Sequence, residues 1–273
     1  MKRKILFILV LTVCIIAILF FILFGNNNNL YCRIFNPKPP EKKESGHKDS
    51  LTENANSYLR TRKDEAALAI YEEILIFDPE NVDALWAKSE ILRRRCHYEE
   101  SAGILHNILS REPDHLPSLI TLAYIKYHFG KLDESLKIIN RVLGSCPLSN
   151  YDTALCYLMK GIISNKRYKK ANFLSKLKSG MQIKSYFLTA NKLAPDLPEV
   201  HLSLGTYYLV APHFLGGNLD SAIEELELAV AIAPDFASAS AKLAQAYKKK
   251  GLEDKSEVYR KRAESLGLCE NYE

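Results

Sequence analysis

The sequence predicts an all-α protein, in which one apolar N-terminal helix is followed by a helical solenoid of about six helix–turn–helix repeats. Three observations support this fold class. An uncharged run of 20 residues extends from Ile5 to Phe24. Farther along, Pro79, Pro113 and Pro147 follow one another at intervals of 34 residues. Small and large apolar residues recur in a fixed frame between these prolines. Since proline cannot continue a helical hydrogen-bond ladder, a constant period of this kind indicates stacked helical hairpins.

The run from Ile5 to Phe24 has the properties of a transmembrane helix. As a helix it would be ~30 Å long, which matches the hydrocarbon thickness of a bilayer. A cleaved signal peptide is the alternative. The run is longer than the usual ~7–15 apolar residues of a signal peptide, however, and no small-x-small cleavage site follows it. We therefore expect residues 1–24 to form a basic flank and a signal-anchor helix.

The residues that flank this helix predict its orientation and a linker. Lys2, Arg3 and Lys4 precede the apolar run, and fewer basic residues follow it closely. Positive-inside bias then favours a cytoplasmic N-terminus and an exported C-terminal domain. Residues 25–47 contain four consecutive asparagines, three prolines and alternating charges. This composition is typical of a flexible linker.

The recurring frame divides residues 48–271 into six units. Alanine or serine recurs where two helices would cross closely, and larger apolar side chains surround that position. In the second unit, for example, Ser89 and Ser101 take the small positions, and Leu92, Leu105 and Ile108 take larger ones. The predicted repeats span about 48–81, 82–115, 116–149, 150–197, 198–236 and 237–271.

This pattern resembles the tetratricopeptide repeat family, because spacing and residue type agree in consecutive units. The resemblance implies a non-enzymatic scaffold whose concave groove, lined by the first helix of each repeat, binds partner proteins. Six residues are placed on that surface by the frame: Asn56, Trp86, Glu90, Arg93, Tyr124 and Tyr127. Trp86, the only tryptophan, has either a buried packing role or a role as a binding anchor. Some members grip C-terminal carboxylates with lysine and asparagine side chains. Asn56 matches one such position, but Thr52, Trp86 and Ile120 replace the others, so that clamp is not expected here.

The fourth and fifth repeats carry insertions of 14 and five residues. The first insertion lies within residues 169–182, and the segment from Thr153 to Pro195 holds nine Lys or Arg and no Asp or Glu. We expect an amphipathic helix that breaks near Ser179 and Gly180. The basic residues form either a solvated face or a contact for anionic lipid or an acidic partner. They are Lys166, Arg167, Lys169, Lys170, Lys176, Lys178 and Lys184.

The second insertion, from Ala211 to Asn218, separates the two helices of the fifth repeat. We expect an elongated turn in which Phe214 and Leu215 plug a neighbouring surface. The Ala-Pro-x-x-x-Gly-Gly pattern is similar to that of bacterial tetratricopeptide proteins that accompany TRAP-type solute transporters. This local resemblance implies an alternative function, as an accessory subunit of a transport or cell-envelope assembly system.

Sequence motifs for other functions are absent. The cysteines are scattered without C-x-x-C spacing, so we expect unpaired thiols and a weak preference for a reducing compartment. The seven histidines form no metal-ligand pair, and no nucleophile, paired-acid or dinucleotide motif occurs. We therefore expect no metal, no cofactor and no catalysis. We do not expect nucleic acid as a partner, because the basic segment has few aromatics and lies between acidic regions.

Overall fold

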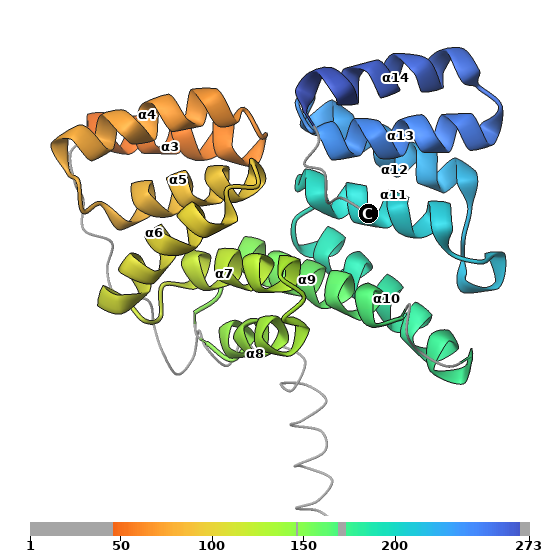
Figure 1. Cartoon of the computed structure of the whole chain (residues 1–273), viewed down its shortest axis with the longest axis horizontal. Helices are drawn as coiled ribbons and strands as arrows, with labels where there is room; N and C mark the ends of the chain where they lie inside the picture. The colour runs from red at the N-terminus through yellow and green to blue at the C-terminus, as the bar shows by residue number, and fades with distance from the viewer. Residues whose placement is uncertain (1–45, 146, 169–172, 268–273) are drawn as a thin grey trace, which may run out of the picture. The chain divides into compact units, whose positions relative to one another are not determined.

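The structure, a computed structural model, describes residues 46–145, 147–168 and 173–267. As the sequence predicts, this part of the chain is all-α, with twelve α-helices and one short 3-10 helix, η1. Figure 1 shows the helices following one another as antiparallel pairs. The expected helix over residues 5–24 and nearly all of the expected linker lie outside the described residues. Within the described ranges no helix is both long and apolar enough to cross a membrane.

The helices form six consecutive pairs, and each pair packs against the next. The pairs are α3 (Gly46–Arg60) with α4 (Asp64–Phe77), α5 (Val82–Arg94) with α6 (Tyr98–Arg111), α7 (Leu116–His128) with α8 (Leu132–Leu143), α9 (Asn150–Tyr168) with α10 (Phe173–Leu193), α11 (Pro198–Val210) with α12 (Leu219–Ile232), and α13 (Ala237–Lys250) with α14 (Glu253–Leu266).

The two helices of a pair are joined by small buried residues at their crossing. Ser101 in α6 donates a hydrogen bond of 2.7 Å to the carbonyl of Ser89 in α5. In the same way Ser135 donates to the carbonyl of Ala123, at 2.7 Å. In the last pair Ser256 donates the equivalent hydrogen bond to the carbonyl of Ala244, at 2.9 Å. A serine at this position lets the two backbones approach closely and gives its own hydroxyl a buried acceptor.

The turn inside each short pair passes through a left-handed residue. Gly130 and Gly251 have φ values of 74° and 79°. At the equivalent positions of the first two repeats, Arg62 has a φ of 59° and Cys96 a φ of 65°. Left-handed backbone costs a residue with a side chain roughly 1–2 kcal/mol, so glycine is the expected residue there. Arg62 and Cys96 depart from this preference for glycine, so other contacts must hold them in the left-handed conformation.

The first insertion lengthens two helices. The helices α9 and α10 have 19 and 21 residues, whereas the other α-helices have 12 to 15. The expected break near Ser179 and Gly180 is wrong, since α10 continues through both residues. Gly180 has a packing role instead. A Cβ atom there would lie 2.7 Å from Leu215 Cδ1, so glycine lets that side chain pack directly against the helix backbone.

The second insertion forms a turn that packs onto α10. It contains η1 (His213–Leu215), and Leu215 is buried against Gly180. The Tyr207 hydroxyl is within hydrogen-bond distance of the carbonyl oxygens of Gly180 and Leu215, at 3.1 and 2.8 Å. The side chain of Phe214 points outward with 68% of its surface exposed. Of the two residues expected to plug this surface, only Leu215 does so.

The cysteines differ from the expectation of unpaired thiols. Cys96, in the left-handed turn of the second repeat, is disulfide-bonded. Cys156 is a free thiol in the core of α9. Its burial raises the pKa of that thiol to about 12, so it remains protonated and packs as a small apolar group.

Two glycines in helices allow a matched test of this packing. A Cβ at Gly205 in α11 would lie 2.6 Å from Leu226 Cγ and 3.1 Å from the Ala222 carbonyl oxygen, whereas Gly103 in α6 has nothing within 4 Å. We expect Gly205→Ala to lower the free energy of unfolding by about 1–3 kcal/mol through overpacking. The same change at Gly103 should raise it by up to about 1 kcal/mol, because alanine favours helix. Urea denaturation of both variants measures the signs, and equal signs would contradict the crossing described here.

Candidate functional site

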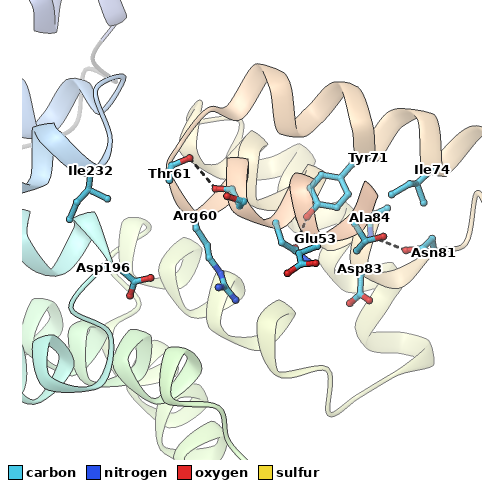
Figure 2. Close-up of a pocket in the computed structure, with 13 residues that line it drawn as sticks. Glu53, Arg60, Thr61, Tyr71, Ile74, Asn81, Asp83, Ala84, Asp196 and Ile232 are labelled. Atoms are coloured by element: carbon cyan, nitrogen blue, oxygen red, sulfur yellow. Dashed lines mark hydrogen bonds between the residues drawn. The ribbon is translucent and has the colours of Figure 1, made fainter. Parts of the chain in front are cut away.

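The main candidate site is a groove of about 760 Å³ beside the first repeat. Figure 2 shows its lining side chains, most of which come from α3, α4 and the start of α5. Two further residues, Asp196 before α11 and Ile232 at the end of α12, complete it. The lining residues are Thr52, Glu53, Asn56, Ser57, Arg60, Thr61, Tyr71, Ile74, Asn81, Asp83, Ala84, Asp196 and Ile232.

The helix α3 presents polar side chains to the groove because of its period. Thr52, Asn56 and Arg60 are four residues apart and therefore share one helix face. The Tyr71 hydroxyl donates a hydrogen bond of 2.7 Å to Asn56 Oδ1. Burial, with the nearby Asp83 carboxylate, raises the pKa of Tyr71 to about 12. The tyrosine therefore stays neutral and orients the amide of Asn56.

Carboxylates outnumber cations in the groove. Glu53, Asp83 and Asp196 line it together with one cation, Arg60. The Arg60 guanidinium lies over the ring of Tyr151, with Cζ 5.1 Å from the ring centroid. Burial is the main cause that raises the pKa of Tyr151, so this ring also remains neutral. The groove thus presents a negative lining with one stacked guanidinium.

A buried ion network lies next to the groove and centres on Glu90. Its carboxylate accepts hydrogen bonds from Arg93 at 2.5 and 2.9 Å and from Arg94 at 3.0 Å. Thr121 on α7 donates to the same carboxylate at 3.0 Å, and Trp86 Nε1 donates to Thr121 Oγ1 at 3.1 Å. Burial by itself would raise the pKa of Glu90. The two arginines and the Thr121 hydrogen bond outweigh it and lower that pKa to about 2.

Arg94 connects this network to the first and fifth repeats. Its guanidinium donates to the Leu59 carbonyl at 2.9 Å and to Asp64 Oδ1 at 2.7 Å. It also lies 3.9 Å from Glu199 Oε1 on α11. Although burial alone would lower the pKa of Arg94, the carboxylates of Asp64, Glu90 and Glu199 raise it, so the charge is permanent. Three repeats therefore meet at one buried guanidinium.

The six residues predicted to form the binding surface fall into different environments. Asn56 lines the groove. Trp86, Glu90 and Arg93 belong to the ion network, and Tyr124 lies beneath the Arg93 guanidinium, 4.6 Å from its Cζ. Tyr127 is covered by Lys166, whose Nζ is 4.5 Å from the ring centroid. Four of the six are thus brought together: Arg93 contacts both Glu90 and Tyr124, and Trp86 is linked to Glu90 through Thr121.

Sequence reasoning missed Arg60 and Arg94, which carry much of the charge at the site. The two are 34 residues apart, so they occupy the same position of successive repeats. A search for charged residues that recur in the frame would have found both. It would not have found Glu199, whose partners come from repeats far away in the sequence.

The predicted basic surface is only partly described. Arg167 pairs with Asp133, Lys166 covers Tyr127, and Lys184 Nζ lies 5.2 Å from the centroid of the Tyr208 ring. Lys169 and Lys170 lie outside the described residues. Lys176 and Lys178 are in α10, but their side chains lie outside the description. The three described cations therefore contact the chain itself.

The described residues contain no group of three or more His, Cys, Asp or Glu side chains that could hold a metal ion. The most buried histidine, His201, has both ring nitrogens within hydrogen-bond distance of acceptors. Nδ1 is 2.7 Å from Glu225 Oε2, and Nε2 is 2.7 Å from the Pro195 carbonyl oxygen. Hence this imidazole holds α11 and α12 together, and neither nitrogen is available to a substrate.

Removal of the Glu90 charge tests the ion network. Glu90→Gln keeps the shape of the side chain but leaves two largely buried guanidinium groups without a carboxylate between them. We expect it to lower the free energy of unfolding by roughly 3–5 kcal/mol. In the exposed pair of Arg95 and Glu65, the matched change Glu65→Gln should cost less than about 1 kcal/mol. Urea denaturation measures both, and similar losses would contradict a network that stabilises the packing of repeats.

Comparisons with known proteins support the fold. No protein-family model matches the chain. Superkiller protein 3 of Saccharomyces cerevisiae is 31% identical over 88 residues, which cover 32% of this chain and 6% of the yeast protein. This chain therefore spans a small part of that relative. A likeness to one segment of a much longer protein carries no activity across.

Two solved structures resemble the chain over most of its length. A thermophilic TPR protein of Thermus thermophilus superposes with a TM-score of 0.54 at 20% identity, covering 68% of this chain and 91% of the other. Human IFIT1, solved as a dimer with m7Gppp-AAAA, gives a TM-score of 0.54 at 20% identity, covering 73% of this chain and 45% of the other. At such identities the similarity shows the fold alone. The described chain is an all-α solenoid with a tetratricopeptide-like fold.

Proposed function

We propose that the chain is a membrane-anchored scaffold that binds a partner protein through the groove beside the first repeat. The observation that carries this proposal is the groove itself, an open volume of about 760 Å³ lined by one face of α3. Tetratricopeptide-like solenoids suit this role, because paired helices leave one continuous face for an extended or helical segment of a partner. The scaffold has no catalytic part.

The charge of the groove supports a protein partner in preference to nucleic acid. Three carboxylates and one guanidinium line it. Such a lining repels phosphate, whereas nucleic-acid affinity comes largely from cations that neutralise phosphates. We infer that the bound segment carries lysine or arginine. The basic residues of the fourth repeat are proposed as a second, weaker contact with anionic lipid or an acidic partner.

The proposed membrane anchor is the uncharged run over residues 5–24. With the N-terminus in the cytoplasm, the solenoid would be exported. The three basic residues that precede the run, Lys2, Arg3 and Lys4, support that orientation.

An accessory subunit of a transport or envelope-assembly system is the second candidate. It is favoured by the turn of the fifth repeat, which packs through Leu215 on Gly180 and presents Phe214 to solvent. Purification from membranes separates the candidates. Recovery of a transporter component whose binding depends on Phe214 would favour the accessory subunit, and binding that depends on the groove would favour the scaffold.

A photo-crosslinker in the groove tests the scaffold. With p-benzoylphenylalanine at Ser57, which is exposed and lines the groove, we expect a crosslinked partner after irradiation of cells. The same group at Glu73, exposed on α4 and outside the groove lining, should give none. Glu53→Lys should weaken the Ser57 adduct, because it replaces a groove carboxylate by a cation, whereas Glu99→Lys, exposed on α6 and outside the groove lining, should leave it unchanged. Equal labelling from Ser57 and Glu73 would contradict the proposal.

Removal of the N-terminal run tests the anchor. We expect the chain that lacks residues 1–24 to leave the membrane fraction, because only a long apolar helix gives effectively irreversible insertion. Sedimentation after carbonate extraction measures this. Replacement of residues 25–43 by a Gly-Ser linker is the control and should leave the chain in the pellet. A truncated chain that still sediments would disprove the anchor.

A further inference from the structure

Arg62 is a costly residue at a position that favours glycine. It has a φ of 59° in the turn between α3 and α4, where two other repeats use glycine. A cationic residue held in left-handed backbone persists when surrounding contacts over-determine it. The contacts of its side chain supply the reason.

The Arg62 side chain reaches two residues that are far away in the sequence. Its Nη1 donates a hydrogen bond of 2.7 Å to Glu199 Oε1 in the first turn of α11. Its guanidinium carbon also lies 3.9 Å from the centroid of the Phe236 ring, at the residue that precedes α13. Only 12% of the Arg62 side chain and 17% of the Glu199 side chain are exposed. The ion pair is thus largely shielded from water and screened less by salt.

The chemistry of this contact suits arginine specifically. A planar guanidinium can stack on an aromatic ring and, at its edge, donate hydrogen bonds to a carboxylate. Glu199 is favoured there because it sits at the positive N-terminal end of α11 and near Arg94. Lysine would keep the charge but would lose the stack and the planar edge.

The same three residues lie next to both walls of the groove. On one wall Arg60 and Thr61 directly precede Arg62. On the other, Asp196 is three residues before Glu199, and Ile232 is four residues before Phe236. A separation of the backbones at Arg62 and Glu199 would therefore move the two groove walls apart.

We propose that Arg62, Glu199 and Phe236 form an intramolecular clasp that sets the width of the groove by holding the first repeat against the fifth and sixth. The clasp is a conformational device of the fold. When the clasp is closed, the groove has both walls. When it opens, the first repeat moves away from the fifth and sixth repeats while the hairpin of α3 and α4 stays folded. This inference concerns the free chain, so it stands or falls independently of what the groove binds.

The distance between the two walls tests the clasp directly. Nitroxide labels on p-acetylphenylalanine at Asn54 and Ala231, exposed residues of α3 and α12, report that distance by double electron–electron resonance on the full chain in detergent. We expect one narrow distribution in the parent chain. Arg62→Gly should add a longer component, with an increase of the open population on the order of tenfold, as loss of roughly 1.4 kcal/mol implies. Glycine suits the turn, so the hairpin of α3 and α4 is retained.

Three further variants separate the clasp from a general effect. Arg62→Lys should give an intermediate population, because the charge remains but the stack is lost. Glu199→Gln should open the groove, and the double change with Arg62→Gly should open it by less than the sum of the two single changes, because each single change already breaks their shared ion pair. Arg95→Gly, which removes an exposed ion pair with Glu65, should leave the distribution narrow.

Two results would overturn the proposal. The first is an unchanged distance distribution in Arg62→Gly when circular dichroism shows native helix content. The second is additive opening by the Arg62 and Glu199 variants, which would mean that the residues act separately. A binding partner that fails to crosslink at Ser57 would disprove the proposed scaffold without affecting either measurement.

Discussion

The fold depends on the close crossing of two helices at a small residue, repeated along the chain. Where the small residue is serine, its hydroxyl bonds to a carbonyl of the partner helix, as Ser101 does with Ser89. Where the residue is glycine, as at Gly205, even one methyl group would collide with Leu226. Because each hairpin is held at this crossing, its outer residues are free to pack on the next hairpin. A solenoid of similar units follows.

Buried charged residues add specific contacts between repeats that the repeat pattern itself does not require. Glu90, Arg94 and Glu199 come from the second and fifth repeats, and burial makes each depend on the others. A buried ion pair stabilises little compared with apolar packing, but removal of one partner is costly. The network therefore acts mainly to specify which repeats meet. Trp86 and Arg93, which were predicted to line the binding surface, take part in this network, and both keep part of their surface exposed.

The regular repeats could be predicted from the sequence because their signals are local. The alternation of small and large apolar positions is visible within one hairpin, and the 34-residue spacing of prolines is visible between neighbouring hairpins. The fourth and fifth repeats, which carry the insertions, were harder to predict. Ser179 and Gly180 suggest a break in a helix, but α10 continues because Gly180 meets Leu215 across a distance of 35 residues in the chain. Glycine for close packing and glycine for a break look alike in sequence.

By itself the sequence determined the helical class, the hairpin period and the place of Asn56 within the first repeat. Periodicity within one helix is enough for these features. Only the tertiary structure decided which charged residues are buried, that Arg62 contacts Glu199 and Phe236, and that Asp196 and Ile232 complete the groove. Such contacts depend on how successive hairpins accumulate in space. The small rotation from each hairpin to the next is set by packing and is not encoded in any single repeat.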